Sequence, residues 1–480
     1  MTRSVVLGVD LGTTATKVVA STVDGRRVAF AERGYPLRTD STGAATQDPD
    51  VVAAQAIAAI TECARGLDVA AICFSAAMHT LLALDADGRP LTQALSWADN
   101  RAADTARALR ADPARASALH RATGTPVHPM SPLVKLAWFA EHEPDPQRAT
   151  AHWVGLKDYV LYRLTGHLVT DHSCASGTGL LDIHRLAWHP ESLRLAGITA
   201  AQLPDLLPPN EIRPLRAEID GLPTGLPVVV GGADGPLANL GTGAVRPGTA
   251  AVSLGTSGAL RVITETPGVD EAGRVFCYAL ADGLWVRGGA ISNGGVVAAW
   301  AADTFGVDVA TLLTEAAATS ADDLLALPYL LGERAPWWEP DPRAVILGLR
   351  REHGRAELTR ALLDGVGQQL ALVAEAVPGI GEIRATGGAF RAPIWGQVIA
   401  AALNRPLALT AEAAGSGLGA ALLGWHALGA LPTLAEVADL ITPTHIISPD
   451  PDLARSLARR RPLVERAHTA LREIVTDLAT

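Results

Sequence analysis

The stretch VVLGVDLGTTATK, residues 5–17, decides the fold of this chain. It begins with an apolar run that predicts a buried strand and continues into a turn that contains Gly12, Thr13 and Thr14. Glycine lets the backbone bend sharply and approach a ligand, and successive N–H groups of such a turn can form an anion-binding concavity. The threonine hydroxyls and the charge of Lys17 would add to it, so the turn predicts phosphate binding. An ordinary hairpin is the alternative.

The predicted strand ends in a carboxylate, Asp10. A carboxylate beside a phosphate-binding turn would repel the phosphate unless a cation lay between them. Asp10 therefore indicates Mg²⁺, which prefers carboxylate, water and substrate phosphate oxygens.

A second copy of the pattern begins the other half of the chain, as AAVSLGTSG, residues 250–258. When the two turns are aligned, Gly255 and Thr256 fall in the second turn, and Ser253 stands where the first copy has its acid. Each copy is followed by an Asp-Gly pair between apolar runs, which is a strong hairpin signal. Both halves are thus predicted to open with a strand, a phosphate-type turn, a strand and a hairpin. Two such turns with one metal-directed carboxylate would suit a nucleotide held between two domains.

A second acid follows a buried strand in LPVVVGGADGPLANLGTG, residues 226–243. Asp234 stands at a predicted helix start, where it could be a simple cap or a carboxylate directed into a cleft. The pattern returns weakly as AGSGLGAALLG, residues 414–424, without the acid. This asymmetry favours Asp234 as a general base.

Two further stretches could contact a small substrate. The apolar run VAAICFSAAMH ends in Met78 and His79, and ligands of open α/β sheets bind at the carboxyl ends of strands. A structural histidine is the alternative. The stretch ALSWADNRA offers a ring, acceptors and a forked donor of the kind that sugar hydroxyls require, although it could also be a loop that caps a helix. Its candidate residues are Trp97, Asp99, Asn100 and Arg101.

The whole composition excludes some classes of protein. The 480 residues allow two or three domains, and a net charge of −10 argues against a nucleic-acid surface. The four dispersed cysteines form no zinc or disulfide pattern, which favours a reducing cytoplasm. Residues 413–435 lack charged side chains but are rich in glycine, so we expect a buried helix and no membrane span. An apolar run interrupted by an acid near the N-terminus also argues against a signal peptide.

Several motifs, taken together, carry a resemblance to a known family. DLGTT, SPLVKLAWFAEH, GGAD, SLGTSG, GERAPWW and TGGAFRAPIW occur in the order that is typical of the FGGY carbohydrate kinases. The chain resembles this branch of the actin-like ATPase superfamily over nearly its full length. SAAMH with SWADNRA and PYLLGERAPWW is most similar to gluconokinases, with xylulokinases next. The one departure is Arg343-Ala344, where the family usually has Arg-Gly.

The resemblance implies an α/β fold of two ribonuclease-H-like domains, residues 1–244 and 245–480, with an interdomain active-site cleft. It implies ATP and Mg²⁺, and phosphorylation of gluconate, alternatively xylulose, at a terminal hydroxyl. A non-catalytic regulator of the same fold is a distant alternative, and a homodimer is compatible with the sequence.

Residue by residue, the resemblance implies that Asp234 is the base and Asp10 organises the metal. The first turn and Gly255-Thr256 would hold phosphates, and the sugar would meet the stretches that contain Met78, His79 and Trp97. Glycines would line the adenosine pocket: Gly295, Gly387 and Gly388. A sugar acid also wants a cationic partner, for which Arg101, Lys157 and His79 are candidates.

Overall fold

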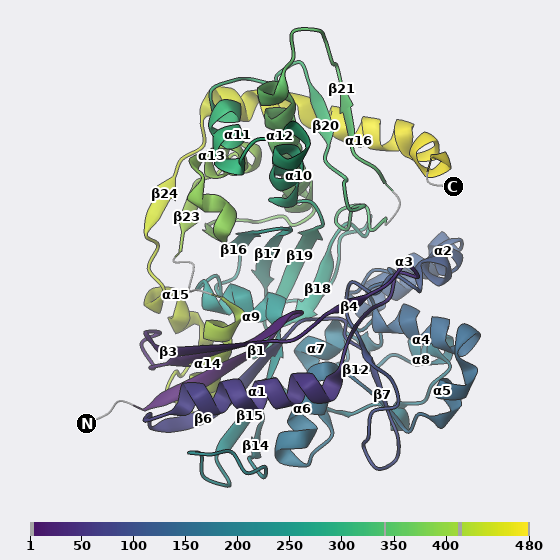
Figure 1. The fold of residues 1–480 in the computed structure, drawn as a ribbon, viewed down its shortest axis with the longest axis vertical. Coiled ribbons are helices and arrows are strands. Elements are labelled where there is room, and N and C mark those ends of the chain that lie inside the picture. Colours follow the sequence, from purple (N-terminus) through teal and green to yellow (C-terminus); the bar gives the residue numbers. More distant parts are fainter. Residues whose placement is uncertain (1–3, 340–341, 411–414, 479–480) are drawn as a thin grey trace.

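The computed structural model describes residues 4–339, 342–410 and 415–478, which form two lobes, each built on one β-sheet (Figure 1). In the first sheet β1 (Val5–Leu11), β2 (Ala15–Ser21) and β3 (Arg27–Gly34) run antiparallel in sequence order. β6 (Val69–Ala76) and β15 (Pro227–Ala233) continue the sheet parallel to β1, and β14 (Ile212–Pro214) closes its edge. The predicted strand, turn and strand of residues 5–21 are therefore confirmed.

The second sheet repeats this order around β16 (Ala250–Leu254) and β17 (Gly258–Thr264). β22 (Ile383–Thr386) and β23 (Leu407–Leu409) continue it parallel to β16, and β24 (His445–Ile447) lies at the edge. The strand beside β17 is β19 (Trp285–Ile291), and β18 (Phe276–Ala279) lies outside it. The two predicted Asp-Gly hairpins both form, but they join different strand pairs: β2 to β3 in one half and β18 to β19 in the other.

Two glycine-rich helices lie between the sheets and tie the halves together. α9 (Asp234–Gly241) belongs to the first half and α14 (Ser416–Ala427) to the second, and they pack closely on each other. α14 also packs on β1 and β6 of the first half, so the first lobe includes a segment from the second half of the chain. This packing confirms a buried helix within residues 413–435, of which 413 and 414 lie outside the described residues.

Local sequence signals account for several helices of the first half. α1 (Pro49–Ala64) begins after Asp48, whose carboxylate accepts hydrogen bonds from two backbone N–H groups of the first turn. α6 (Leu156–Thr165) ends at Gly166, which has φ 73°. α4 (Pro132–His142) forms where the motif SPLVKLAWFAEH predicts it.

The other elements complete the two lobes and their outer layers. In the first half these are β4 (Arg38–Thr39), β5 (Ala45–Gln47), β7 (Leu82–Leu84), β8 (Ala94–Leu95), α2 (Ala103–Arg110), α3 (Pro113–Thr123), α5 (Pro144–Ala149), β9 (His152–Val154), β10 (Val169–Asp171), α7 (His172–Ser176), β11 (Leu181–Asp182), β12 (Ala187–Trp188), α8 (Pro190–Ala196) and β13 (Asp205–Leu207). In the second half they are α10 (Val296–Phe305), α11 (Val309–Ala317), β20 (Leu325–Leu327), β21 (Val345–Leu347), α12 (Arg355–Glu375), α13 (Pro393–Leu403), α15 (Val437–Leu440) and α16 (Pro451–Asp477).

Within the described ranges, no single helix has the length and apolar character needed to cross a membrane. By those two criteria alone, α10 and α11 pass as a pair, but a 101° bend separates them.

Candidate active site

The two predicted acids lie at the same edge of the first sheet. Asp10 pairs in register with Ser75 of β6, and Ser75 pairs with Gly232 of β15, two residues before Asp234. Since neighbouring strands lie about 4.8 Å apart, the backbones of Asp10 and Gly232 are roughly 10 Å apart, and Asp234 follows just beyond Gly232. Asp234 is the first residue of α9, and its Oδ1 accepts the N–H of Gly235 at 2.7 Å. The carboxyl ends of β1 and β15 therefore bring both carboxylates to one place.

The electrostatics of the two acids differ. Burial raises the pKa of Asp234 to about 6, the charge of Asp10 contributes to the rise, and Arg261 opposes both effects. Burial also raises the pKa of Asp10, although hydrogen bonds from Ser416 and Ser75 and the charge of Lys17 lower it. Ser75 Oγ donates to Asp10 Oδ1 at 2.9 Å. A carboxylate with a raised pKa at a sheet edge is a candidate general base.

The pKa of Asp234 predicts the acidic limb of the pH–rate profile. A base must be deprotonated to accept a proton, so we expect kcat/KM to fall tenfold per pH unit below about pH 6. Steady-state rates between pH 5 and 9 test this expectation. Because Arg261 lowers the pKa of Asp234, the limb should move to higher pH when Arg261 is replaced by methionine. An acidic limb at the same pH in Arg261→Met as in wild type would contradict the effect of Arg261 on the pKa of Asp234.

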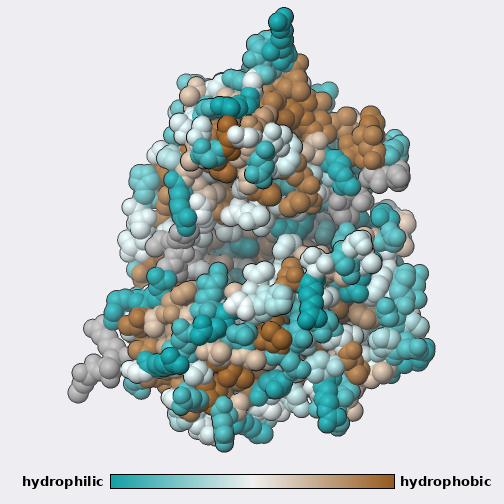
Figure 2. Space-filling view, viewed as in Figure 1, coloured by the Kyte–Doolittle hydropathy of each residue, from teal (hydrophilic) through white to brown (hydrophobic). Residues whose placement is uncertain are grey.

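A cavity of about 210 Å³ opens beside Asp234, and the surface is hollowed between the two lobes (Figure 2). The first half contributes Met78, His79 and Trp97 to the lining, and the second half contributes residues of β17 and of the second glycine turn. The cavity thus joins the predicted sugar segments to the predicted phosphate turn. Its remaining lining residues are Met130, Gly235, Ser253, Ser257, Gly258, Ala259, Arg261, Phe276, Tyr278, Ala290, Arg334 and Trp338.

The first glycine turn is held by side chains from three other segments. Tyr35 donates its hydroxyl to Gly12 O at 2.8 Å, and Gln47 donates its amide to Thr13 O at 2.9 Å. Trp97 Nε1 donates to Thr13 Oγ1 at 3.0 Å. The predicted phosphate turn and the predicted sugar segment are therefore in direct contact. Thr14 is exposed at the same turn, and Lys17 lies opposite Asp10 in the β1–β2 register.

Glycines from three strand ends meet at the second turn. Gly295 donates its N–H to Gly255 O at 2.7 Å, and Thr256 lies between Gly255 and the next strand. Gly387 has φ 121°, and a Cβ there would lie 2.3 Å from Leu254 O, so only glycine allows this approach. Gly388 follows it at the start of a short 3₁₀ turn. The structure therefore brings together all the predicted nucleotide-side glycines of the second half, and their role in binding ATP stays a prediction.

His79 is held in a strained conformation at the cavity wall. Its φ is 66°, which is rare for a residue with a Cβ, and its Nδ1 lies 2.6 Å from Gly177 O. Burial, followed by the charge of Lys135, lowers the pKa of His79 to about 3. The imidazole is therefore neutral at pH 7, which suits a hydrogen-bonding residue better than a cationic partner.

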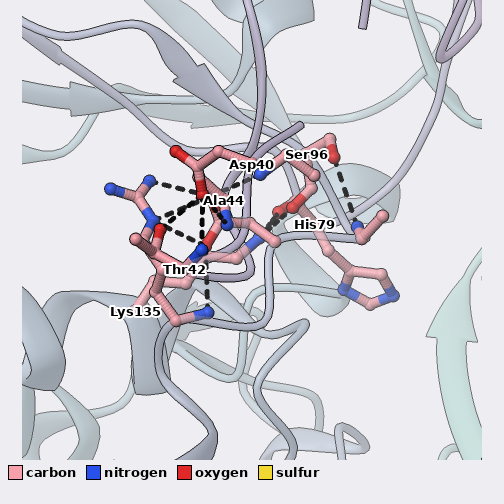
Figure 3. Close-up of polar contacts among 10 residues, drawn as sticks. Asp40, Thr42, Ala44, His79, Ser96 and Lys135 are labelled. Atoms are coloured by element: carbon pink, nitrogen blue, oxygen red, sulfur yellow. Dashed lines mark hydrogen bonds and ion pairs between the residues drawn. The ribbon is translucent and has the colours of Figure 1, made fainter. Parts of the chain in front are cut away.

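Lys135 joins the two predicted sugar segments. Its Nζ donates to His79 O at 2.7 Å and to Ser96 O at 2.6 Å (Figure 3). The side chain is fully buried on α4, and burial lowers its pKa to about 7. In the sequence, Lys135 is one of three lysines and part of the motif SPLVKLAWFAEH, but no role is predicted for its side chain. The fold makes it the residue that fixes the segments ending in His79 and beginning at Ser96.

Three other predicted contact residues, Asp99, Arg101 and Lys157, lie outside the lining of this cavity. Asp99 is buried, accepts the Ala45 N–H at 3.1 Å and forms a bidentate pair with Arg101. The Arg101 guanidinium also stacks over Trp138 at 5.0 Å. Lys157 is buried and pairs with Asp171 at 2.7 Å. The cationic groups of Arg101 and Lys157 are thus already neutralised by acids of the protein.

Sequence reasoning missed several lining residues. Arg334 and Trp338 belong to the Pro- and Trp-rich stretch 328–349, whose role no pattern predicts and of which residues 340–341 lie outside the described part. Arg261 and Tyr278 belong to β17 and β18. A charged residue within the apolar run ALRVIT was the one available signal for Arg261.

Comparisons with known proteins agree with this architecture. The family model "FGGY family of carbohydrate kinases, N-terminal domain" matches residues 5–241, and the model of the C-terminal domain matches residues 250–428. A gluconokinase from Bacillus licheniformis is 36% identical over 99% of this chain and 98% of its own length. Crystal structures of a gluconate kinase and of a ligand-bound xylulose kinase, both from Lactobacillus acidophilus, each match with TM-score 0.93, 32% identity and coverage of 98% of both chains. The two lobes share one strand order, and both acids and the glycine turns lie at their junction. Family models match both halves of the chain, which therefore belongs to the FGGY family of carbohydrate kinases.

Proposed function

We propose that this carbohydrate kinase transfers the γ-phosphoryl group of ATP to the terminal hydroxyl of gluconate, which gives 6-phosphogluconate. One observation carries the proposal: Asp234 shares a cavity with Met78 and His79 from one half and with Ser257 and Gly258 from the second glycine turn. A sugar hydroxyl and a phosphate could therefore meet beside a single carboxylate. Gluconate is favoured because a gluconokinase matches this chain at 36% identity over its full length.

Each residue has a simple task in this reaction. Phosphoryl transfer needs positioning, charge neutralisation and a base for the attacking hydroxyl, and little covalent chemistry. Asp234 accepts the hydroxyl proton, while the N–H groups and hydroxyls of the turns at Gly12 and Gly255 hold phosphate oxygens. Lys135 fixes the backbone carbonyls of the two sugar segments, so the acceptor is held in one orientation.

Asp10 fits a magnesium ion by its chemistry. Mg²⁺ is commonly held by one or two carboxylates together with waters and substrate phosphates. Asp10 supplies one carboxylate next to the first glycine turn, and Ser75 and Ser416 orient it. In the described part of the chain, no three His, Cys, Asp or Glu residues gather as a metal cage, so this ion would arrive with the nucleotide. When bound, it would neutralise charge on the transferred phosphoryl group.

The acceptor is tested by an ADP-release assay over gluconate, xylulose, ribulose, glycerol and fuculose. We expect the highest kcat/KM with gluconate and weak turnover of the neutral sugars. Strong turnover of xylulose with none of gluconate would replace the first choice by xylulose, the substrate named for one of the equally similar structures. No turnover of any acceptor would favour a binding protein that has lost catalysis.

The metal site is tested by Asp10→Asn. Asparagine keeps the size of the side chain but removes its charge, so we expect the Mg²⁺ concentration for half-maximal rate to rise by at least ~10-fold. Glu32→Gln is the control, because Glu32 is half-exposed and lies 4.0 Å from Lys17 on the neighbouring strand. An unchanged Mg²⁺ dependence in Asp10→Asn would remove Asp10 from this role.

The compartment, the domain boundary and the oligomeric state complete the proposal. The described cysteines, Cys63, Cys73, Cys174 and Cys277, are all free, in keeping with a cytoplasmic enzyme. The boundary between residues 244 and 245 falls between the two matched segments and stays a prediction, as does a homodimer.

A further inference from the structure

Two guanidinium groups face the cavity from different segments of the second half. Arg261 comes from β17, and its Nη1 donates to Ser253 Oγ at 3.3 Å. Arg334 comes from the stretch after β20. It donates to Ser292 Oγ at 3.3 Å and to Ile291 O at 3.0 Å, and its guanidinium lies 5.4 Å from the ring of Trp97.

Neither guanidinium forms an ion pair with a carboxylate of the described residues. The acid next to Arg334, Glu333, instead accepts hydrogen bonds from Asn293 and from the backbone N–H groups of Ser292 and Arg334. Burial lowers the pKa of both arginines, and the charge of Arg334 contributes to the lowered pKa of Arg261. Buried charges are normally paired, because an unpaired one is costly to desolvate. The charge of Asp234 opposes this lowering at both arginines, but one carboxylate cannot neutralise two guanidinium groups, so the pair calls for a second anion.

The charges that line the cavity do not balance. Asp234 is the only acid among the described lining residues, against two arginines. With Asp234 ionised the lining keeps one positive charge, and a neutral sugar would leave that charge uncompensated. A sugar acid would neutralise it.

A tyrosine hydroxyl next to the arginines also lacks a partner. Tyr278 is 2% exposed, lines the cavity, and its hydroxyl forms no hydrogen bond with the described residues. Its ring is fixed by stacking on Phe276 at 4.2 Å and by an edge contact with His79 at 6.0 Å. A fixed, buried O–H without an acceptor is costly, so the position suits an oxygen of a ligand.

We propose that Arg261 and Arg334 form the site that binds the carboxylate of an acidic acceptor and make this enzyme select sugar acids over neutral sugars. This inference deepens the proposed function and rests on it. It also replaces the cationic partners expected from the sequence, because Arg101 and Lys157 are paired with Asp99 and Asp171. The other anion in the reaction is the nucleotide's γ-phosphate, and the experiment must separate the two.

The experiment compares gluconate and xylulose in wild type, Arg261→Met and Arg261→Lys. Since a hydrogen bond between charged groups stabilises a complex by about ten- to one-hundred-fold in affinity, we expect Arg261→Met to lower kcat/KM for gluconate about 30-fold. At a pH well above the acidic limb of both enzymes, where the raised pKa of Asp234 has no effect, kcat/KM for xylulose should change by less than about threefold. KM for ATP should also change by less than about threefold. Arg261→Lys should recover part of the loss, because it keeps the charge but not the fork.

The matched control is Arg287→Met. Arg287 lies on β19, opposite Val262 of β17, and is not among the lining residues. Arg287→Met should leave the ratio of kcat/KM for gluconate to that for xylulose unchanged. Thermal unfolding of each variant distinguishes a loss of folding from a loss of substrate recognition. Equal losses for both acceptors in Arg261→Met, with a raised KM for ATP, would show a γ-phosphate contact and overturn the proposal.

A failure of the proposed function gives a different result. In that case wild type turns over xylulose and not gluconate, and the site is tested by inhibition of that reaction by xylonate. Weaker inhibition of Arg261→Met than of wild type would still place a carboxylate at these arginines. Equal inhibition of the two would overturn the inference as well.

Discussion

Asp234→Asn is expected to keep the fold and to lower kcat by at least ~10²-fold, the usual size of a general-base contribution. Asparagine has nearly the shape of aspartate but accepts no proton at neutral pH. Its carbonyl can still accept the Gly235 N–H that Asp234 accepts at 2.7 Å, so the start of α9 should be preserved. Steady-state kinetics with gluconate measure the loss, and KM should change much less than kcat.

The same substitution should stabilise the protein. The pKa of Asp234 is raised from 3.8 to about 6 in the folded state, so between these values the native state binds more protons than the unfolded state. Stability therefore falls as pH rises through this window, and above pH 6 the full cost of the buried charge remains. Removing the charge should raise the unfolding free energy at pH 7.5 by about 1–3 kcal/mol. Urea unfolding at pH 7.5 and at pH 4 measures the difference, which should shrink at the lower pH.

The control for both effects is Asp205→Asn. Asp205 is an exposed aspartate on β13, away from the cavity lining, and its replacement should change neither kcat nor stability measurably. A near-normal kcat in Asp234→Asn would remove Asp234 from the role of base. A loss of activity accompanied by unfolding would show that Asp234 supports structure instead.

Gly8→Ala is expected to destabilise the protein by about 3 kcal/mol or more, the upper end of what overpacking costs. A Cβ at Gly8 would lie 1.9 Å from Gly417 O and 2.7 Å from Ala421 N. Both atoms belong to the backbone of α14, so no side chain can rotate away. The helix must move off β1, and because it lies between the two sheets the disturbance should reach both lobes.

Activity should fall together with stability in Gly8→Ala. α14 begins at Ser416, which stabilises the ionised form of Asp10 by a hydrogen bond. A displaced α14 would withdraw that bond, and the Mg²⁺ requirement should rise as well. Urea unfolding measures the first effect and a Mg²⁺ titration of the rate the second.

The control is Gly415→Ala, at the N-cap of the same helix. A Cβ there meets no described atom within 4 Å, and the residue has φ −121°, which alanine can adopt. We expect its midpoint of urea unfolding to stay close to that of wild type. Equal midpoints for Gly8→Ala and Gly415→Ala would show that α14 is not held against β1 as closely as the structure has it.

The sequence alone determined the features that depend on neighbours along the chain. The strand and turn around Asp10, their repeat at residues 250–258, the cap of α1 and the helix that starts at Asp234 all follow from local pattern. Local pattern suffices because strand period, turn geometry and helix capping are each set within a few residues. The two phosphate-type turns and both acids can therefore be located from the amino-acid sequence, which only implies their chemistry.

Only the tertiary structure decided which charges are free to act. Lys157 and Arg101 looked available in the sequence, but the fold pairs Lys157 with Asp171, which lies on another element, and stacks the paired Arg101 on Trp138. The fold leaves Arg261 and Arg334 without an ion pair to any carboxylate of the described residues and brings them into one cavity, although more than seventy residues separate them. Ion pairing and desolvation are set by whatever the folded chain brings within a few ångströms, and no periodicity records that. For the same reason, pattern could not show that β19, and not β18, pairs with β17.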